Sequence, residues 1–174
     1  PLIDALTVAE IDVAADAQLT AFSLKDVVGQ IDLADATARV KYGNSELSVV
    51  GQGKLDGSVV DVNWREMFAA KAPFRRRYDV KGTIPAGLVE KAGFPSIEPY
   101  VSGPIGTTLH YQVATNGTGE VGGRFDLKTA KLSVVPLAWS KEAGTEALAT
   151  MSLKLAAGGR ITTADFDGRG GGLQ

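Results

Sequence analysis

The side chains that could do acid–base or metal chemistry are few and widely spaced. His110 is the one histidine among 174 residues, and cysteine is absent. The chain therefore offers no thiolate ligand or thiol nucleophile, and His110 would need carboxylates from distant segments to hold a metal. Asp165 and Asp167 would share one face of a strand, but no spacing recommends a carboxylate pair for general acid–base catalysis. We expect no catalytic residue, no metal site and no cofactor; an enzyme would require carboxylates gathered around His110 in a pocket.

Two short runs have the composition of phosphate-binding segments. Gly168-Arg-Gly-Gly-Gly172 is rich in glycine, but neither a strand-to-helix junction nor a Lys-Ser/Thr pair follows it, which indicates a loop or a frayed end. Arg75-Arg76-Arg77 is the densest basic run. On a strand, Arg75 and Arg77 would point to one face and Arg76 to the other. The run is typical of a solvated edge that discourages aggregation, or of a basic rim where Arg75 and Arg77 contact anionic headgroups.

The composition excludes several classes of protein. Apolar residues make up 44% and charged residues 22% of the chain, which is typical of a globular protein and not of a disordered one. The net charge of −2 gives no basic footprint for nucleic acid. Neither a signal peptide nor a run of about 20 apolar residues is present. Because the chain begins at Pro1 without Met, we interpret residues 1–174 as a single β-rich segment of a larger protein.

Alternation of apolar and polar residues predicts β-strands along most of the chain, separated by turn pairs such as Asp56-Gly57 and Gly158-Gly159. The spacing predicts an antiparallel meander of about a dozen strands that forms a curved, trough-like sheet or a sandwich. Residues 64–71 break the alternation and favour a single helical turn, and residues 6–14 fit either a strand or a helix. Pro85 and Gly93 bracket the best helix, which is predicted to be short and to lie near 85–92.

The clearest alternation runs through residues 123–144. Phe125 and Leu127 alternate with polar residues before a polar step at 128–129, and Leu132 and Val134 alternate after it, which predicts two half-buried strands joined in a hairpin. A Val-x-Gly-x-Ile/Phe pattern recurs at residues 80–84, 101–105 and 121–125. Its central glycine predicts a bend, a bulge or a close approach in each copy.

Residues 123–144 also carry a family resemblance, to the AsmA-like proteins of Gram-negative envelopes and particularly the central uncharacterised region of the YhdP branch. Asp126-Leu-Lys-Thr-Ala-Lys-Leu132 resembles the family's Asp-Leu-Thr-x-Ala-x-Leu turn, with Lys128 in place of the usual Thr. Pro136-Leu-Ala-Trp-Ser-Lys141, followed by Gly144, resembles its Leu-Gly-Trp-x-Lys-x-x-Gly, with Ala138 in place of the usual Gly. The resemblance covers roughly residues 45–174 and extends to a Trp-x-Glu-x-Phe run and an Arg-rich strand within residues 64–82.

The resemblance implies a location and a function. AsmA-like proteins are anchored by an N-terminal inner-membrane helix, project into the periplasm as long β-troughs with an apolar inner face, and are implicated in moving phospholipids toward the outer membrane. The expected partners are phospholipid acyl chains and the remainder of the parent chain, with no nucleic acid, and membrane contact would come through the parent's N-terminal helix. The family implies no catalytic residue.

One short helix cannot cover about a dozen strands, so part of the apolar face is expected to stay open to lipid. The groove-facing candidates are the apolar residues of three strands, namely Phe125, Leu127, Leu132, Val134, Leu153 and Leu155. The alternative is a purely structural β-module with a closed core that acts as a spacer or as a protein-docking domain.

Overall fold

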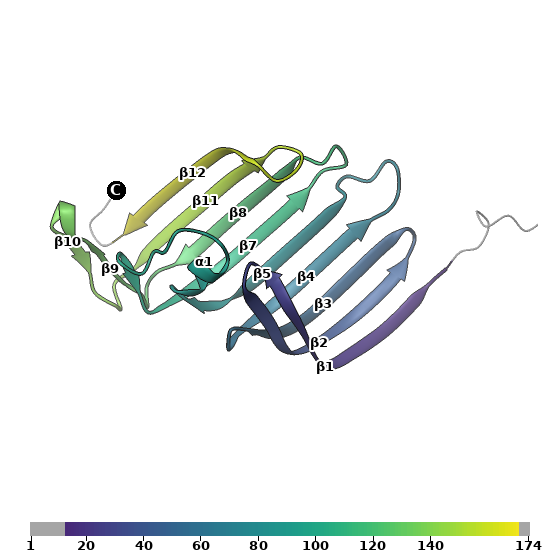
Figure 1. Ribbon diagram of the computed structural model, residues 1–174, viewed down its shortest axis with the longest axis horizontal. Coiled ribbons are helices and arrows are strands. Elements are labelled where there is room, and N and C mark those ends of the chain that lie inside the picture. Colours follow the sequence, from purple (N-terminus) through teal and green to yellow (C-terminus); the bar gives the residue numbers. More distant parts are fainter. Residues whose placement is uncertain (1–12, 171–174) are drawn as a thin grey trace, which may run out of the picture.

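The computed structural model describes residues 13–170, which form a large open β-sheet with a small sheet at one end (Figure 1). The main sheet is antiparallel and has nine strands in the order β1-β2-β3-β4-β5-β7-β8-β11-β12. Its strands are β1 (Ala15–Val28), β2 (Ile31–Gly43), β3 (Glu46–Leu55), β4 (Ser58–Met67), β5 (Arg76–Pro85), β7 (Pro104–Val113), β8 (Gly119–Asp126), β11 (Ala147–Leu155) and β12 (Ile161–Gly170). Because β1 and β12 are opposite edges of the order, the sheet is not closed into a barrel.

The small sheet has three strands in the order β10-β9-β6. They are β6 (Val101–Ser102), β9 (Lys131–Val134) and β10 (Trp139–Lys141), and the 3-10 turn η2 (Val135–Leu137) lies between the last two. The helix α1 spans Leu88–Lys91, inside the predicted range of 85–92. The predicted all-β antiparallel meander with one short helix is therefore confirmed. The predicted element at 6–14 falls almost entirely outside the described residues.

The strand register divides the main sheet into an apolar face and a polar face. Val62 lies opposite Val80, and Val80 lies opposite Leu109 on the next strand, so alternate positions of neighbouring strands share a face. The apolar face carries Val40 and Tyr42 on β2, Leu47 and Val49 on β3, Val60, Val62 and Trp64 on β4, Tyr78 and Val80 on β5, Leu109, Tyr111 and Val113 on β7, Val121 and Phe125 on β8, and Met151, Leu153 and Leu155 on β11.

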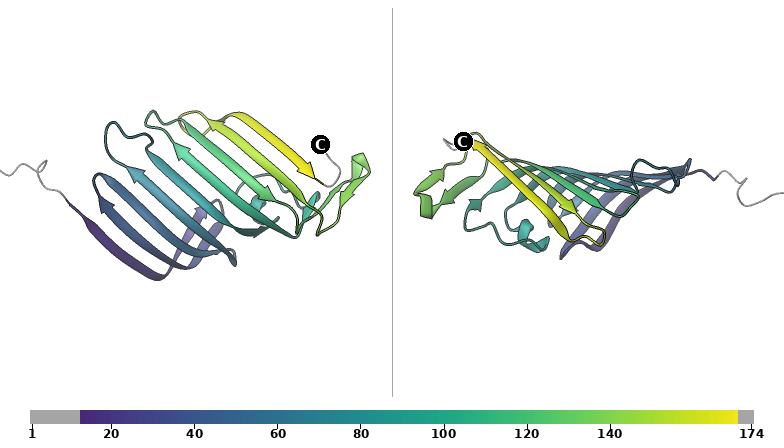
Figure 2. Two further views of the ribbon diagram at one scale, coloured as in Figure 1. Left: turned by 180° about the vertical axis from the view of Figure 1, so that it is seen from behind. Right: turned by 90° about the horizontal axis from the view of Figure 1, so that it is seen from above.

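The strand connections fall at two ends of the sheet because neighbouring strands run in opposite directions. We call one the open end; it carries the short connections 44–45, 68–75, 114–118 and 156–160. We call the other the covered end; it carries the connections 29–30, 56–57, 86–103 and 127–146, which include α1, η2 and the small sheet. Seen edge-on, α1 and the small sheet lie on the same side of the main sheet (Figure 2).

The β1–β2 hairpin bends over the apolar face and reaches α1. Its strands shift register at several points, and Ala21, Asp26 and Asp35 have positive φ values of 53°, 52° and 49°. At the hairpin tip the amide of Gln30 donates to the carbonyl oxygen of Lys91 in α1 at 2.9 Å. A Cβ on Gly29 would overlap that same carbonyl, so glycine permits this approach.

The best-packed core lies at the covered end. Ala86, Ile105 and Ala130 form a buried cluster, and partly buried side chains pack around it: Ile84, Ile97, Val101, Phe125 and Leu127. Val60, Leu88 and Ile31 are also buried, at 1%, 4% and 3% exposure. Toward the open end, the apolar side chains of β4, β5, β7 and β8 are only half-buried. Within residues 13–170, no second layer covers that part of the apolar face.

Two predictions of local structure are wrong. A helical turn was predicted at 64–71, but residues 64–67 belong to β4, which pairs with β3 and β5. The predicted hairpin within 123–135 does not form, because β8 pairs with β7 and β11 whereas β9 pairs with β6 and β10. The hydroxyl of Thr129 donates to the carbonyl oxygen of Pro104 at 2.9 Å, and Ala130 enters the core, so the chain turns into the small sheet.

The recurring glycine pattern marks a close approach in two of its copies and a bend in the third, as predicted. Gly82 and Gly123 both lie on the apolar face, and the side chains of Val60 and Phe125 occupy the space that a Cβ would need. No register shift occurs at either position, so these glycines permit close approach and do not mark bends. Gly103 differs, because it joins β6 to β7 with a φ of 92°.

Candidate functional site

An aromatic ladder crosses the apolar face near the open end. Trp64, Tyr78 and Tyr111 lie on the adjacent strands β4, β5 and β7. The ring centroids of Trp64 and Tyr78 are 5.8 Å apart at 14°, and those of Tyr78 and Tyr111 are 6.1 Å apart at 7°. Burial raises the pKa of the Tyr78 hydroxyl. The three nearly parallel rings, on consecutive strands, form a rigid row across the apolar face at its open-end margin.

An aliphatic surface lies between the ladder and the covered end. Val62 and Leu109 precede the ladder residues of their strands by two positions and Val80 follows Tyr78 by two, whereas Val121 stands beside Tyr111 in register. All four are half-buried, whereas residues on the edge strands are more open, with Phe166 of β12 at 73% exposure. These four side chains carry no charge and no hydrogen-bonding group, so the surface is suited to a hydrocarbon ligand. In the adjoining ladder, Nε1 of Trp64 is buried without a hydrogen-bond partner.

A single ion pair stands at the open-end margin of the ladder. Arg76 of β5 donates from Nη2 to Oε1 of Glu66 at 2.8 Å and from Nε to Oε2 at 3.2 Å. The Glu66 side chain is 13% exposed, and hydrogen bonding to it raises the pKa of Arg76. The pairing neutralises Arg76, so this arginine adds little net charge to the apolar face.

The two arginines predicted to form one basic rim lie in different places. Arg77 points from the polar face, where its Nε and Nη2 each donate to Asp79 at 3.0 Å. The guanidinium of Arg75 instead lies 5.8 Å from the ring centroid of Phe68, in the open-end connection 68–75. Arg75 and Arg77 therefore do not converge. The alternative of a protective edge is also wrong, because β5 is an interior strand between β4 and β7.

The six groove candidates separate into three groups. Leu153 and Leu155 lie on the apolar face of β11, although Leu153 is only 4% exposed. Phe125 and Leu127 pack against the buried cluster at the covered end. Leu132 and Val134 belong to β9 in the small sheet, away from the main-sheet face. Half-buried Leu155 is the one candidate that combines the right face with an uncovered position.

The residues that dominate the uncovered surface were missed as site residues. They are Val62, Trp64, Tyr78, Val80, Leu109 and Tyr111. Their alternation is visible in the sequence and predicts strands. The sequence does not show which strands are neighbours or how they are registered, and only the register brings these side chains together on one face.

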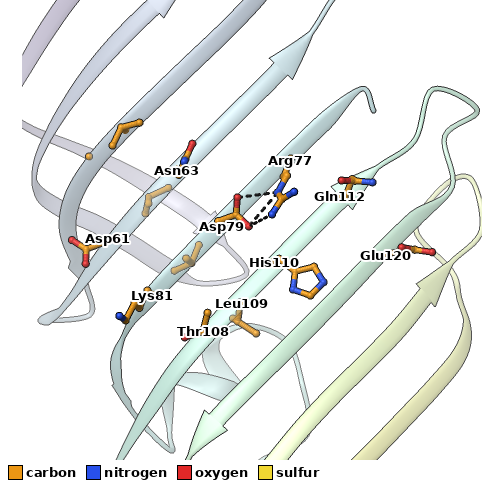
Figure 3. A pocket seen from close by; sticks show the side chains of 14 residues that line it. Asp61, Asn63, Arg77, Asp79, Lys81, Thr108, Leu109, His110, Gln112 and Glu120 are labelled. Carbon is orange, nitrogen blue, oxygen red and sulfur yellow. Dashed lines mark hydrogen bonds and ion pairs between the residues drawn. The ribbon is translucent and has the colours of Figure 1, made fainter. Parts of the chain in front are cut away.

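The polar face holds a shallow depression of about 730 Å³ (Figure 3). His110 lies in it, and its imidazole occupies the space above Gly122. Asp61 and Glu120 lie on opposite sides of the depression, and Asp79 is engaged by Arg77. Across residues 13–170, no three His, Asp or Glu side chains are placed to hold a metal ion. Asp79 lies directly opposite His110 in register but accepts hydrogen bonds from Arg77, and Asp61 and Glu120 come from β4 and β8.

Within residues 126–144, most of the residues that carry the family resemblance lie in the small sheet or beside it. Ala138 adopts the left-handed conformation, with φ 48° and ψ 35°, where the family usually has glycine. Lys141 is 3% exposed, and its ammonium donates to the carbonyl oxygens of Ala130, Glu142 and Lys128 at 2.7, 3.1 and 3.4 Å. The amide of Gly144, whose φ is 97°, donates to the carbonyl oxygen of Lys128 at 2.7 Å. These residues therefore have structural tasks.

Ala138→Gly is expected to raise the free energy of unfolding by about 0.5–1 kcal/mol. The left-handed conformation costs an alanine roughly 1–2 kcal/mol, which exceeds the added flexibility of glycine in the unfolded chain. Ala143→Gly, in the following connection and without positive φ, is the matched control and should be neutral or slightly destabilising. Urea denaturation of both variants measures the contrast. Equal losses of stability in Ala138→Gly and Ala143→Gly would show that the left-handed conformation of Ala138 does not lower the free energy of unfolding.

Within residues 13–170, no helix is long and apolar enough to cross a membrane. Comparison of the chain with protein-family models, with curated protein sequences and with solved structures found no match.

Proposed function

We propose that this chain is a non-enzymatic segment of a periplasmic, inner-membrane-anchored AsmA-like protein, and that its apolar face holds phospholipid acyl chains during transport toward the outer membrane. The observation that carries the proposal is the uncovered half of the apolar face. Among the described residues, 13–170, a protein layer borders the aliphatic surface of Val62, Val80, Leu109 and Val121 at the covered end and none covers it toward the open end. The motif resemblance supplies the family and the compartment.

The energetics of the sheet support a hydrocarbon ligand. An antiparallel sheet buries one face against a second layer in most globular domains. Here α1, residues 94–101 and the small sheet supply that layer at the covered end alone. Each CH₂ group of an acyl chain that leaves water is worth about 0.8 kcal/mol, so a single chain laid along the aliphatic surface would gain several kcal/mol.

A spacer or protein-docking module is the second candidate. The feature that favours it is η2, whose Val135 and Leu137 are 79% and 67% exposed at the tip of the small sheet. Exposed apolar side chains at a tip suit a small protein contact. That function needs no uncovered sheet face, however, and a spacer would be expected to close its core. Lipid binding accounts for the larger feature.

The proposal is tested by asking whether folded protein carries lipid. Residues 1–174 would be purified without detergent from a Gram-negative host, extracted with organic solvent and examined by mass spectrometry. We expect co-purified phospholipid, and we expect delipidated protein to take up a fluorescent phospholipid again. A folded, lipid-free protein that takes up no fluorescent phospholipid would contradict the proposal and favour the spacer.

A further inference from the structure

The connections at the two ends of the main sheet differ in charge. The open-end connections 44–45, 68–75, 114–118 and 156–160 contain Lys71, Arg75 and Arg160 and no carboxylate. The covered-end connections contain both signs, with Asp56, Glu90, Glu98, Glu142 and Glu146 against Lys91, Lys128, Lys131 and Lys141. The open-end connections are therefore basic although the whole chain has a net charge of −2, and the carboxylates nearest to connections 44–45 and 114–118 are Glu46 and Glu120 on the adjoining strand ends.

These three cations keep their charge available. Arg76 and Arg77, the next residues after Arg75, are each paired with a carboxylate. Among the ion pairs of the described residues, none includes Lys71, Arg75 or Arg160. Arg75 is held beside the apolar face by its contact with the ring of Phe68, which is itself 43% exposed. An exposed guanidinium at that position is suited to a phosphate oxygen.

The aromatic ladder lies directly inside this basic margin. Tyr and Trp side chains favour the boundary between hydrocarbon and water, because a large apolar ring carries one polar group. Along β5, the order from the open end is Arg76, Tyr78, Val80, Gly82 and Ile84 on one face. Ile84 packs against the buried cluster, so the stretch open to an acyl chain runs from Tyr78 to Gly82. It is about 13 Å long at about 3.3 Å per residue, close to the hydrocarbon depth of one leaflet, about 15 Å.

We propose that the open end binds the anionic phosphate headgroup of a lipid whose acyl chains run along the strands toward the covered end. The inference rests on the proposed function and assigns an orientation and a substrate class to the same surface. The ladder marks the boundary between headgroup and chain. Lys71 and Arg75 in the β4–β5 connection, and Arg160 in the β11–β12 connection, are the cations that headgroups meet at the open end. Arg77 has no part in this, since it is paired on the polar face.

The test compares lipid classes in a charge-matched pair of variants. Delipidated protein is mixed with vesicles of phosphatidylglycerol or of phosphatidylcholine, and the lipid bound after vesicle removal is measured. The first variant is Lys71→Gln/Arg75→Gln/Arg160→Gln. The control is Lys81→Gln/Arg124→Gln/Lys154→Gln, which removes the same charge from exposed positions of the polar face. Circular dichroism checks that both are folded.

We expect the wild type and the control to prefer phosphatidylglycerol, and the open-end variant to lose that preference by about tenfold or more while still binding phosphatidylcholine. Inorganic phosphate should compete weakly, since it lacks the acyl chains. Retained preference in the open-end variant, an equal loss in the control, or full competition by inorganic phosphate would each overturn the inference while leaving acyl-chain binding in place. Failure of the wild type to bind either lipid would overturn the proposed function and the inference with it.

Discussion

Val62→Asp is expected to weaken acyl-chain binding by about a hundredfold, whereas Val50→Asp leaves it unchanged. The two valines are close neighbours on opposite faces of the sheet, because Val62 pairs with Gly51 and Val50 pairs with Asn63. Val62 belongs to the half-buried aliphatic surface, and Val50 is 53% exposed on the polar face. The two variants therefore place the same charge at neighbouring positions on opposite faces of the sheet.

The size of the effect follows from desolvation. A carboxylate under an acyl chain must lose water without gaining a partner, which costs several kcal/mol, and a hundredfold change in affinity corresponds to about 2.7 kcal/mol. On the polar face the new carboxylate stays hydrated. Binding of a fluorescent phospholipid to delipidated protein measures the contrast.

Two controls separate an effect on lipid binding from an effect on folding, namely the matched Val50→Asp variant and the uncharged Val62→Ser variant. Urea denaturation should show both Asp variants folded under binding conditions, and Val62→Ser should weaken binding by an intermediate factor without adding charge. Binding as tight as that of the wild type in both Asp variants would place the lipid elsewhere. Binding weakened to the same extent in both would show an effect of net charge alone.

The architecture could be predicted from the sequence because it depends on local patterns. Alternating apolar and polar residues predict most of the strands. Asp56-Gly57 forms the predicted turn, with φ values of 49° and 82°. The Pro85–Gly93 bracket placed α1 correctly, and Gly93 ends it with a φ of 92°. Each of these signals lies within a few residues of the structure that it specifies.

The uncovered apolar surface could not be predicted because it depends on pairing between distant segments. Residues 127–146 separate β8 from its partner β11, and the hydrogen bond from Thr129 to Pro104 that helps divert the chain spans 25 residues. No local pattern distinguishes that diversion from a simple hairpin. The bend of the β1–β2 hairpin is equally hidden, since Ala21 and Asp35 adopt positive φ without the glycine that would announce it.

Within residues 126–144 the family resemblance is carried by residues that fold the covered end, whereas the uncovered apolar surface is composed of valine, leucine and aromatic positions, of which Trp64, Tyr78 and Val80 also fall within the resemblance. This division has a physical basis. Hydrocarbon binding asks only for apolar side chains of suitable size on one face, and many sequences satisfy it. Few residue types can adopt the left-handed conformation of Ala138 or replace the buried ammonium of Lys141.

Lys141→Met is expected to destabilise the small sheet by about 2–4 kcal/mol. The ammonium of Lys141 is buried and donates to three backbone carbonyls, of which Ala130 at 2.7 Å is the closest. A methionine has similar length but cannot donate, so the carbonyls of Ala130 and Glu142 lose a charged partner inside the protein. Charged hydrogen bonds contribute about 1.5–3 kcal/mol each, and their loss is only partly offset by removing a buried charge.

Lys131→Met is the matched control for Lys141→Met, because Lys131 also lies on the small sheet but is exposed and pairs with Glu142 at 2.8 Å. An exposed ion pair contributes about 0–1 kcal/mol, so this change should have little effect. Hydrogen exchange would show faster exchange at residues 130–141 in Lys141→Met and unchanged protection in β3 to β5. Because the small sheet packs through Ala130 and Val101 on the covered-end cluster, the loss should extend to Ile105. Equal protection in the two variants would mean that packing alone holds the small sheet, and that the buried ammonium is not what fastens it to the covered end.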